Sequence, residues 1–202
     1  MTFDSSRDAF VVAADWFVAT VAQVGDRWAA EGLGEWDVRA LVGHTSRSLL
    51  TVEAYLAKPA QSVEIETTAE YYRATREIQA GPDVAQRGRD AGLALGDDPV
   101  TAVTTIRDRV VPVVAAQQGS ELVTTIVGGM RLSDYLPTRT FELVVHTADL
   151  ARALGLVVEP PAEAALPALA LIGELAVGDG RAGTLLLALT GRLDLPTGFS
   201  VL

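Results

Sequence analysis

The side chains best suited to chemistry are two histidines and one glutamate, in a chain of 202 residues without cysteine. Glu142 and His146 are four residues apart, and this spacing puts two side chains on one helix face with Cβ atoms roughly 6 Å apart. A carboxylate and an imidazole so placed can bind one cation. His44 is the only other histidine, and therefore the only one left as a third ligand. Three such ligands leave one coordination position open, as in catalytic zinc sites, where a bound thiol or water can ionise.

Two further side chains, Arg139 and Asp149, lie within one helical turn of this pair. Asp149 can orient a ligand histidine from behind, pair with Arg152, or be solvated. Arg139 can pair with an acidic side chain or bind substrate. Helical histidines are also common as packed or surface residues, and Glu-x-x-x-His pairs occur on solvated helix faces. The spacing alone therefore leaves both a metal site and a structural role open.

The composition excludes several classes of protein. Without cysteine there is no disulfide framework, zinc finger or iron–sulfur site. A net charge of −10 and a pI near 4.6 argue against nucleic acid as a partner, because phosphate binding needs a basic surface. The N-terminus lacks the pattern of a signal peptide. Pro167 and Glu174 interrupt the most apolar stretch, which is too short to span a membrane. We therefore expect a cytoplasmic protein that binds neither nucleic acid nor membrane.

Helical periodicity indicates which elements position these side chains. In the first thirty residues, apolar positions recur at steps of four and three, which predicts one helix capped within residues 4–6 and ended near Gly32. These positions are Phe10, Ala14, Phe17, Val21, Val24 and Trp28. A second helix, with Asp37 as its cap, is expected to run to about residue 57. His44 lies one turn past Leu41, close to the inward face of that helix.

The middle of the chain predicts shorter elements. Thr67 and Glu70 fit a capping box, so we expect a helix over 68–80, and another over 83–95. A helix that begins at Asp98-Pro99 should kink or lose its regularity at Pro112. Residues 121–127 are rich in β-branched side chains and are expected to be extended.

The final elements carry the second part of the candidate site. Ser133 is the expected cap of a helix that runs to Leu154 and stops at Gly155, unless the regular helix begins as late as Pro137. Two short helices, at about 161–177 and 181–191, follow it. The run 185–189 of mostly leucines either packs on the preceding helices or forms a dimer contact, so both a monomer and a homodimer remain open.

These elements predict an all-α protein. Four longer helices with short connections favour an antiparallel four-helix bundle with additional short C-terminal helices. We assign residues 1–157 to a metal-binding bundle. Residues 158–202 are expected to form a short, mostly helical extension packed on it.

Two motifs resemble one known family. The segment 36–44 reads WDVRALVGH, and the segment 139–150 reads RTFELVVHTADL. Both resemble motifs of the mycothiol-dependent maleylpyruvate isomerase family, and the likeness covers roughly residues 5–155. It implies a DinB-like four-helix bundle that binds a divalent metal, usually zinc, through His44, Glu142 and His146. It also implies the thiol mycothiol as cosubstrate, and the arginine-rich, lysine-poor composition is consistent with an actinobacterial source.

The resemblance implies that the metal activates a thiol for addition to a small electrophile, followed by isomerisation or by transfer. Members with isomerase activity carry a larger α/β domain after the bundle, whereas only 47 residues follow Gly155 here. This difference favours an electrophile other than maleylpyruvate. Two alternatives remain: hydrolysis by metal-bound water, with Asp149 or Glu142 as general base, and a non-catalytic, metal-dependent binding module.

Overall fold

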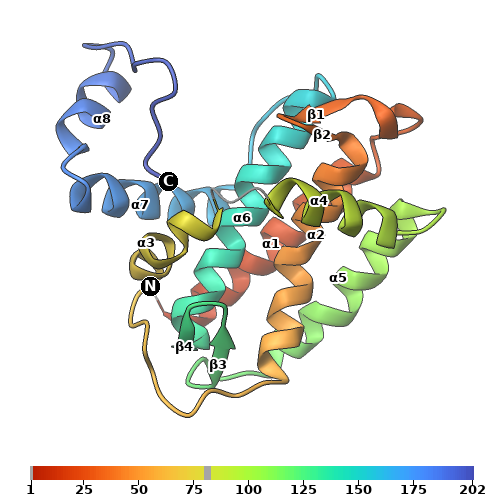
Figure 1. The fold of residues 1–202 in the computed structure, drawn as a ribbon, viewed down its shortest axis with the longest axis horizontal. Coiled ribbons are helices and arrows are strands. Elements are labelled where there is room, and N and C mark those ends of the chain that lie inside the picture. The colour runs from red at the N-terminus through yellow and green to blue at the C-terminus, as the bar shows by residue number, and fades with distance from the viewer. Residues whose placement is uncertain (1, 80–82) are drawn as a thin grey trace.

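The computed structural model describes residues 2–79 and 83–202, and these form a mostly helical fold (Figure 1). The helices are α1 (Phe3–Val21), α2 (Val38–Leu56), α3 (Thr68–Gln79), α4 (Asp83–Ala94), α5 (Pro99–Ala115), α6 (Leu132–Ala153), α7 (Ala162–Gly178) and α8 (Ala182–Leu189). The minor elements are a 3₁₀ turn, η1 (Arg27–Ala29), and the strands β1 (Glu31–Leu33), β2 (Trp36–Asp37), β3 (Leu122–Thr125) and β4 (Gly128–Arg131). β1 pairs with β2 and β3 with β4, both antiparallel.

Four of the helices enclose the core. α1 packs against α5 and α6, and α2 packs against the same two helices, which closes a ring of four. The centre is filled by fully buried aliphatic and aromatic side chains from all four helices, among them Phe10, Phe17, Leu41, Leu49, Val103, Val110, Leu136 and Leu143. The expected all-α bundle is therefore confirmed. Within the described residues, no helix is both long and apolar enough to cross a membrane.

α4 lies unusually close to α2 at a pair of glycines. A Cβ atom on Gly43 would overlap the main chain of Ala91 and Gly92, and a Cβ on Gly92 would come within 2.7 Å of the Arg39 carbonyl oxygen. One turn earlier on α4, a Cβ on Gly88 would meet the Trp36 ring at 2.5 Å. Small residues at these positions let α4 cover the N-terminal half of α2, where His44 lies.

Two boundaries of α1 differ from those expected. The cap is Thr2, whose hydroxyl accepts a hydrogen bond from the Ser5 amide, and no residue within 4–6 serves. The helix ends at Val21, because the chain turns through Gly25 at φ 64° and enters η1. Val24 is nevertheless fully buried. The apolar period continues past the helix because the following turn folds back onto the same core.

The start of α6 also corrects the expectation. The helix begins at Leu132, directly after β4, and Ser133 is not its cap. The amides of Leu132 and Ser133 donate to the carbonyl oxygens of Glu121 and Gly119, at 2.7 and 2.9 Å. These loop carbonyls satisfy donors that a capping side chain would otherwise satisfy. Pro137 and, in α5, Pro112 both lie inside helices that continue beyond them.

The two C-terminal helices differ in how they pack. α7 contacts α6, α1 and α3 and buries Ala164, Leu171 and Leu175. α8 projects away from the bundle at the upper left of Figure 1 and has no buried residue. Within the run 185–189, Leu185 is half-buried and packs against the core, whereas Leu186, Leu187 and Leu189 are exposed, so packing and a dimer contact both stay predictions. After α8 the chain returns, and Val201 is buried in the core.

Candidate metal centre

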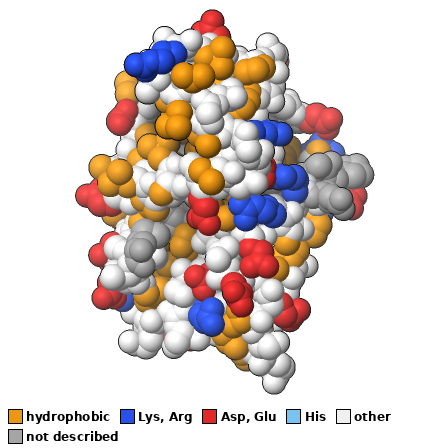
Figure 2. Space-filling model, turned by 90° about the vertical axis from the view of Figure 1, so that its left-hand side faces the viewer, with side chains coloured by type: hydrophobic (Ala, Val, Ile, Leu, Met, Phe, Trp, Pro, Cys, Tyr) orange, Lys and Arg blue, Asp and Glu red, His pale blue; other side chains and the backbone are white. Residues whose placement is uncertain are grey.

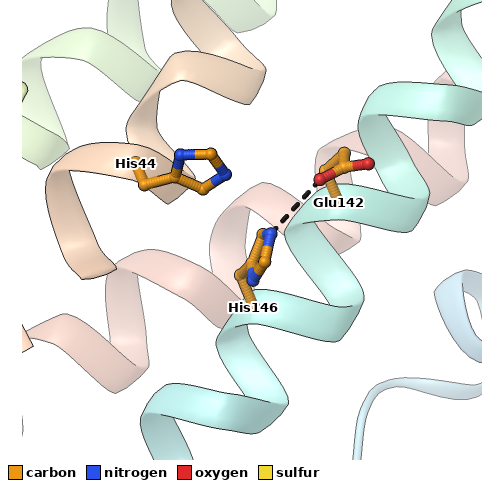
Figure 3. Close-up of side chains that lie close together, drawn as sticks. All are labelled: His44, Glu142 and His146. Atoms are coloured by element: carbon orange, nitrogen blue, oxygen red, sulfur yellow. Dashed lines mark ion pairs between the residues drawn. The ribbon is translucent and has the colours of Figure 1, made fainter. Parts of the chain in front are cut away.

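His44, Glu142 and His146 come together between α2 and α6 (Figure 3). One potential ligand atom from each lies within 4.8 Å of those from the other two. Nε2 of His146 is 3.2 Å from Oε2 of Glu142, and the two imidazole rings lie edge to face with centroids 4.9 Å apart. All three side chains are half-buried rather than sealed. The three candidate ligands proposed from the sequence therefore converge at one point that solvent can reach.

The two helices place these side chains for simple reasons. The Asp37 carboxylate accepts a hydrogen bond from the Ala40 amide at 2.7 Å, which fixes the start of α2 two turns before His44. On α6, Glu142 and His146 share one face at the i, i+4 spacing. Because α2 packs directly on α6, the two faces meet.

Trp36 holds the ring of His44 from one side. The two rings are 4.4 Å apart between centroids and tilted by 33°. The indole Nε1–H of Trp36 donates to the Ala85 carbonyl oxygen at 2.9 Å, which ties the indole to α4. Trp36 therefore restricts the orientation of a candidate ligand.

Glu142 is kept ionised by its neighbours. Burial alone would raise the pKa of Glu142, but the hydrogen bond from His146 and the charge of Arg139 outweigh it and hold the pKa at about 2. The phenol of Tyr72 donates to Oε1 at 2.8 Å, so Oε2 is the oxygen turned towards His146. A permanently charged carboxylate with one oxygen already occupied suits a ligand that binds through the other.

His146 lies between two carboxylates. Its Nδ1 is 3.3 Å from Oδ2 of Asp149, on the side of the ring away from Glu142. Burial lowers the pKa of His146, but the hydrogen bonds to Asp149 and Glu142 dominate and raise it to about 9. Asp149 makes no ion pair with Arg152 among the described residues, so of the three roles considered for it the structure shows the contact with the histidine.

His44 has the opposite environment. Burial, reinforced by the nearby His146, lowers the pKa of His44 to about 3, so its imidazole is neutral and keeps a free lone pair. Nδ1 is buried without a hydrogen-bond partner, while the outer ring nitrogen points towards Glu142 and His146 in Figure 3. A neutral imidazole facing a carboxylate and a second imidazole is a donor set that fits a divalent cation. The residues present can therefore hold a metal ion.

The three side chains line a half-open pocket of about 520 Å³. Glu142 carries the one side-chain carboxylate among the described residues that line it, whereas Arg47, Arg87 and Arg139 contribute three guanidinium groups. A second hollow of about 550 Å³, beside Glu53 and Glu121, contains no histidine. Chemistry at the candidate metal centre would therefore take place in a pocket with a basic wall, although the chain as a whole is acidic.

Arg139 does not form the salt bridge that was one of its expected roles. Its guanidinium lies 5.2 and 5.6 Å from the ring centroids of Tyr135 and Tyr71, and its Nε donates to the Thr138 hydroxyl at 2.9 Å. No carboxylate among the described residues lies within 4.0 Å of it.

Sequence reasoning also missed Tyr72, since α3 carries no motif that links it to Glu142.

Comparison with known proteins agrees with the motifs. No curated protein matches the chain, and neither does any solved structure. A family match covers the helices that supply all three candidate ligands and leaves out α7 and α8. Residues 12–151 match the mycothiol maleylpyruvate isomerase N-terminal domain, and the chain belongs to this family.

Proposed function

We propose that the protein is a metal-dependent enzyme that adds a thiol, with mycothiol as the cosubstrate, to a small electrophile, as a transferase or an isomerase. The observation that carries this proposal is the convergence of His44, Glu142 and His146 at the wall of an open pocket. Zinc is the expected metal, because two imidazoles and one carboxylate with an open position are typical of its catalytic sites. We further propose that the protein acts in the cytoplasm, in an actinobacterium that makes mycothiol.

The residues of the chain have separate tasks in this proposal. A divalent cation bound by the three ligands supplies a Lewis acid that lowers the pKa of a thiol. Asp149 accepts the Nδ1–H of His146, so Nε2 is the ring nitrogen that would give up its proton and bind the cation. Tyr72 holds Oε1 of Glu142 and leaves Oε2 free. Apolar and aromatic side chains, including Trp36 and Phe141, form the walls of the pocket in which the thiol and the electrophile would meet.

The pocket favours a thiol over water as the nucleophile. Hydrolysis by a metal-bound water needs a general base, whereas a thiol that has already ionised does not. Both histidines and Glu142 serve as ligands in this proposal, and Asp149 is hydrogen-bonded to His146. No other carboxylate side chain or histidine lines the pocket among the described residues. A cosubstrate that supplies the sulfur also suits a chain without cysteine.

Elemental analysis and a thiol-conjugation assay on the same purified protein test the proposal. We expect about one divalent ion per chain and conjugation of an electrophile panel that depends on added mycothiol. Turnover without thiol would instead support the hydrolase. No turnover, together with no thermal shift on adding mycothiol, would support a binding module. A folded protein that retains no metal after incubation with zinc would overturn the proposal.

A further inference from the structure

Arg139 is a buried cation that forms no ion pair within 4.0 Å among the described residues. Its side chain is nearly inaccessible, with 9% of its surface exposed. One of its five N–H donors is used by Thr138, and no described carboxylate is close enough to pair with it. An arginine cannot lose its charge to avoid this cost. Buried charges in proteins are normally paired, so an unpaired one directed into a pocket indicates a missing partner.

The surroundings of Arg139 fix its position but compensate its charge only in part, through the more distant Glu142 carboxylate. The rings of Tyr71 and Tyr135 flank the guanidinium, and cation–π contacts of this kind offset only part of the desolvation cost. The Tyr135 hydroxyl donates to Thr51 at 3.0 Å and does not contact the arginine. The guanidinium is thus held in place before any ligand arrives, which is how binding groups are preorganised.

Two more arginines line the same pocket. Arg47 comes from α2 and Arg87 from α4, both half-buried, and neither forms an ion pair with a described residue. The one side-chain carboxylate among the described lining residues, that of Glu142, already contacts Tyr72 and His146. Three like charges around one pocket of an acidic chain repel each other, and a bound anion would relieve that repulsion.

We propose that Arg139, assisted by Arg47 and Arg87, forms an anion subsite beside the metal centre that binds a carboxylate group of the electrophile. This inference rests on the proposed function for its place in the reaction. The planar fork of a guanidinium matches a carboxylate through two parallel hydrogen bonds.

The spacing along α6 sets the size of the ligand. Arg139, Glu142 and His146 follow one another at i, i+3 and i+7 on one helix face. At 1.5 Å of rise per residue, Glu142 and His146 lie about 4.5 and 10 Å further along the helix than Arg139. A carboxylate held at Arg139 therefore leaves atoms a few bonds away beside the metal centre, so the subsite selects short-chain acids.

Calorimetric titration of the full chain, with and without zinc, tests this subsite. The probes are succinate, its uncharged diamide, and inorganic phosphate. We expect succinate to bind the wild-type chain in both metal states and the diamide not to bind. Arg139→Gln should weaken succinate binding at least about tenfold, since a charge-assisted pair is lost. Arg139→Lys, which keeps the charge but not the fork, should be intermediate. Arg152→Gln, on an exposed arginine of the same helix, should leave binding unchanged.

The other outcomes are equally decisive. Absence of succinate binding, or equal binding by Arg139→Gln with an unchanged circular dichroism spectrum, would overturn the subsite. Phosphate binding as tightly as succinate, through Arg139, would overturn the assignment to a carboxylate. If Arg139→Gln fails to fold, Arg47→Gln at the half-buried edge replaces it and should weaken succinate binding several-fold; unchanged binding would count against the subsite.

The metal-free arm separates this inference from the proposed function. Succinate binding that depends on Arg139 in a chain unable to take up zinc would retain the subsite and overturn the metal-dependent function. Zinc uptake and thiol conjugation without any binding of succinate would retain the metal-dependent function and overturn the subsite.

Discussion

α2 and α8 each contain four leucines and one glycine, yet they pack differently. α2 buries more than half of its residues and lies so close to α4 that Gly43 has no space for a Cβ atom. α8 buries none, and the position of a Cβ on Gly183 has no atom within 4 Å. Figure 2 views the side on which α8 lies and shows hydrophobic side chains gathered on the upper part of that face. Hydrophobicity alone therefore does not decide burial; close approach by a neighbouring element does.

The largest predicted effect is on zinc affinity, at the ligands that the close packing of α2 brings together with those of α6. Structural zinc sites bind with about 10–16 kcal/mol, so loss of one ligand of three should cost roughly 4 kcal/mol, about a thousandfold in affinity. His146→Ala and Glu142→Gln should therefore lose zinc in competition with a chromophoric chelator. Glu174→Gln makes the same chemical change on an exposed residue of α7 and should bind zinc as the wild type does. Zinc affinity that is unchanged in His146→Ala would place the metal elsewhere.

The next effect concerns the helix crossing itself. Gly43→Ala should lower the free energy of unfolding by about 2–3 kcal/mol, because its methyl group overlaps the main chain of α4. Gly183→Ala should raise it by less than about 0.5–1 kcal/mol or leave it unchanged, since Gly183 lies in the first turn of α8 and its methyl group would displace nothing. Urea unfolding of both variants measures the pair. Equal effects would mean that α2 and α4 are further apart than the structure shows.

A smaller effect on metal affinity is expected at Asp149, which contacts the candidate ligand His146 on the side away from Glu142. Asp149→Asn removes the charge that orients His146, and such partners typically contribute 10–100-fold to metal affinity. Chelator competition should show a loss in this range while helicity is unchanged. A loss as large as that of His146→Ala would make Asp149 a ligand rather than an orienting residue, and no loss would leave it as a solvated surface group.

The smallest effect belongs to α8. Leu187→Gln, on a side chain that is 46% exposed, should change the free energy of unfolding by less than about 0.5 kcal/mol. Leu175→Ala in α7, where the side chain is fully buried, should cost about 2–5 kcal/mol. Thermal or urea unfolding compares the two. A large loss in Leu187→Gln would reveal that this face is covered in solution.

The sequence predicted what depends on local spacing. The i, i+4 pair on α6, the Asp37 cap, the start of α3 and the ends of α4 and α7 follow from periodicity and capping chemistry, and all lie within a residue or two of the expected positions. The expected end of α3 at residue 80 lies outside the described residues. The Thr67 hydroxyl caps the Glu70 amide as expected, although the Glu70 carboxylate reaches the amide of Glu66 instead. Such features need only neighbouring residues.

What the sequence did not predict depends on distant contacts. Tyr72 lies 70 positions before the glutamate that it holds, and the tyrosines around Arg139 come from α3 and α6. The early start of α6 relies on carbonyls of the loop before β3. The hairpin of β1 and β2 was not expected either. To predict any of these contacts, one must know which helices, strands and loops pack against each other. The periodicity of apolar residues along one helix does not carry that information.

The return of the chain after α8 has a consequence for how this family member can vary. Arg181 at the start of α8 hydrogen-bonds to the Ser200 carbonyl oxygen and lies over the Phe199 ring, while Leu202 lines the pocket. α8 is thus the tip of a loop anchored at both ends. Doubling such a loop costs only about 0.6 kcal/mol of closure entropy, so residues 182–198 can be lengthened or replaced without moving the wall that faces the metal centre.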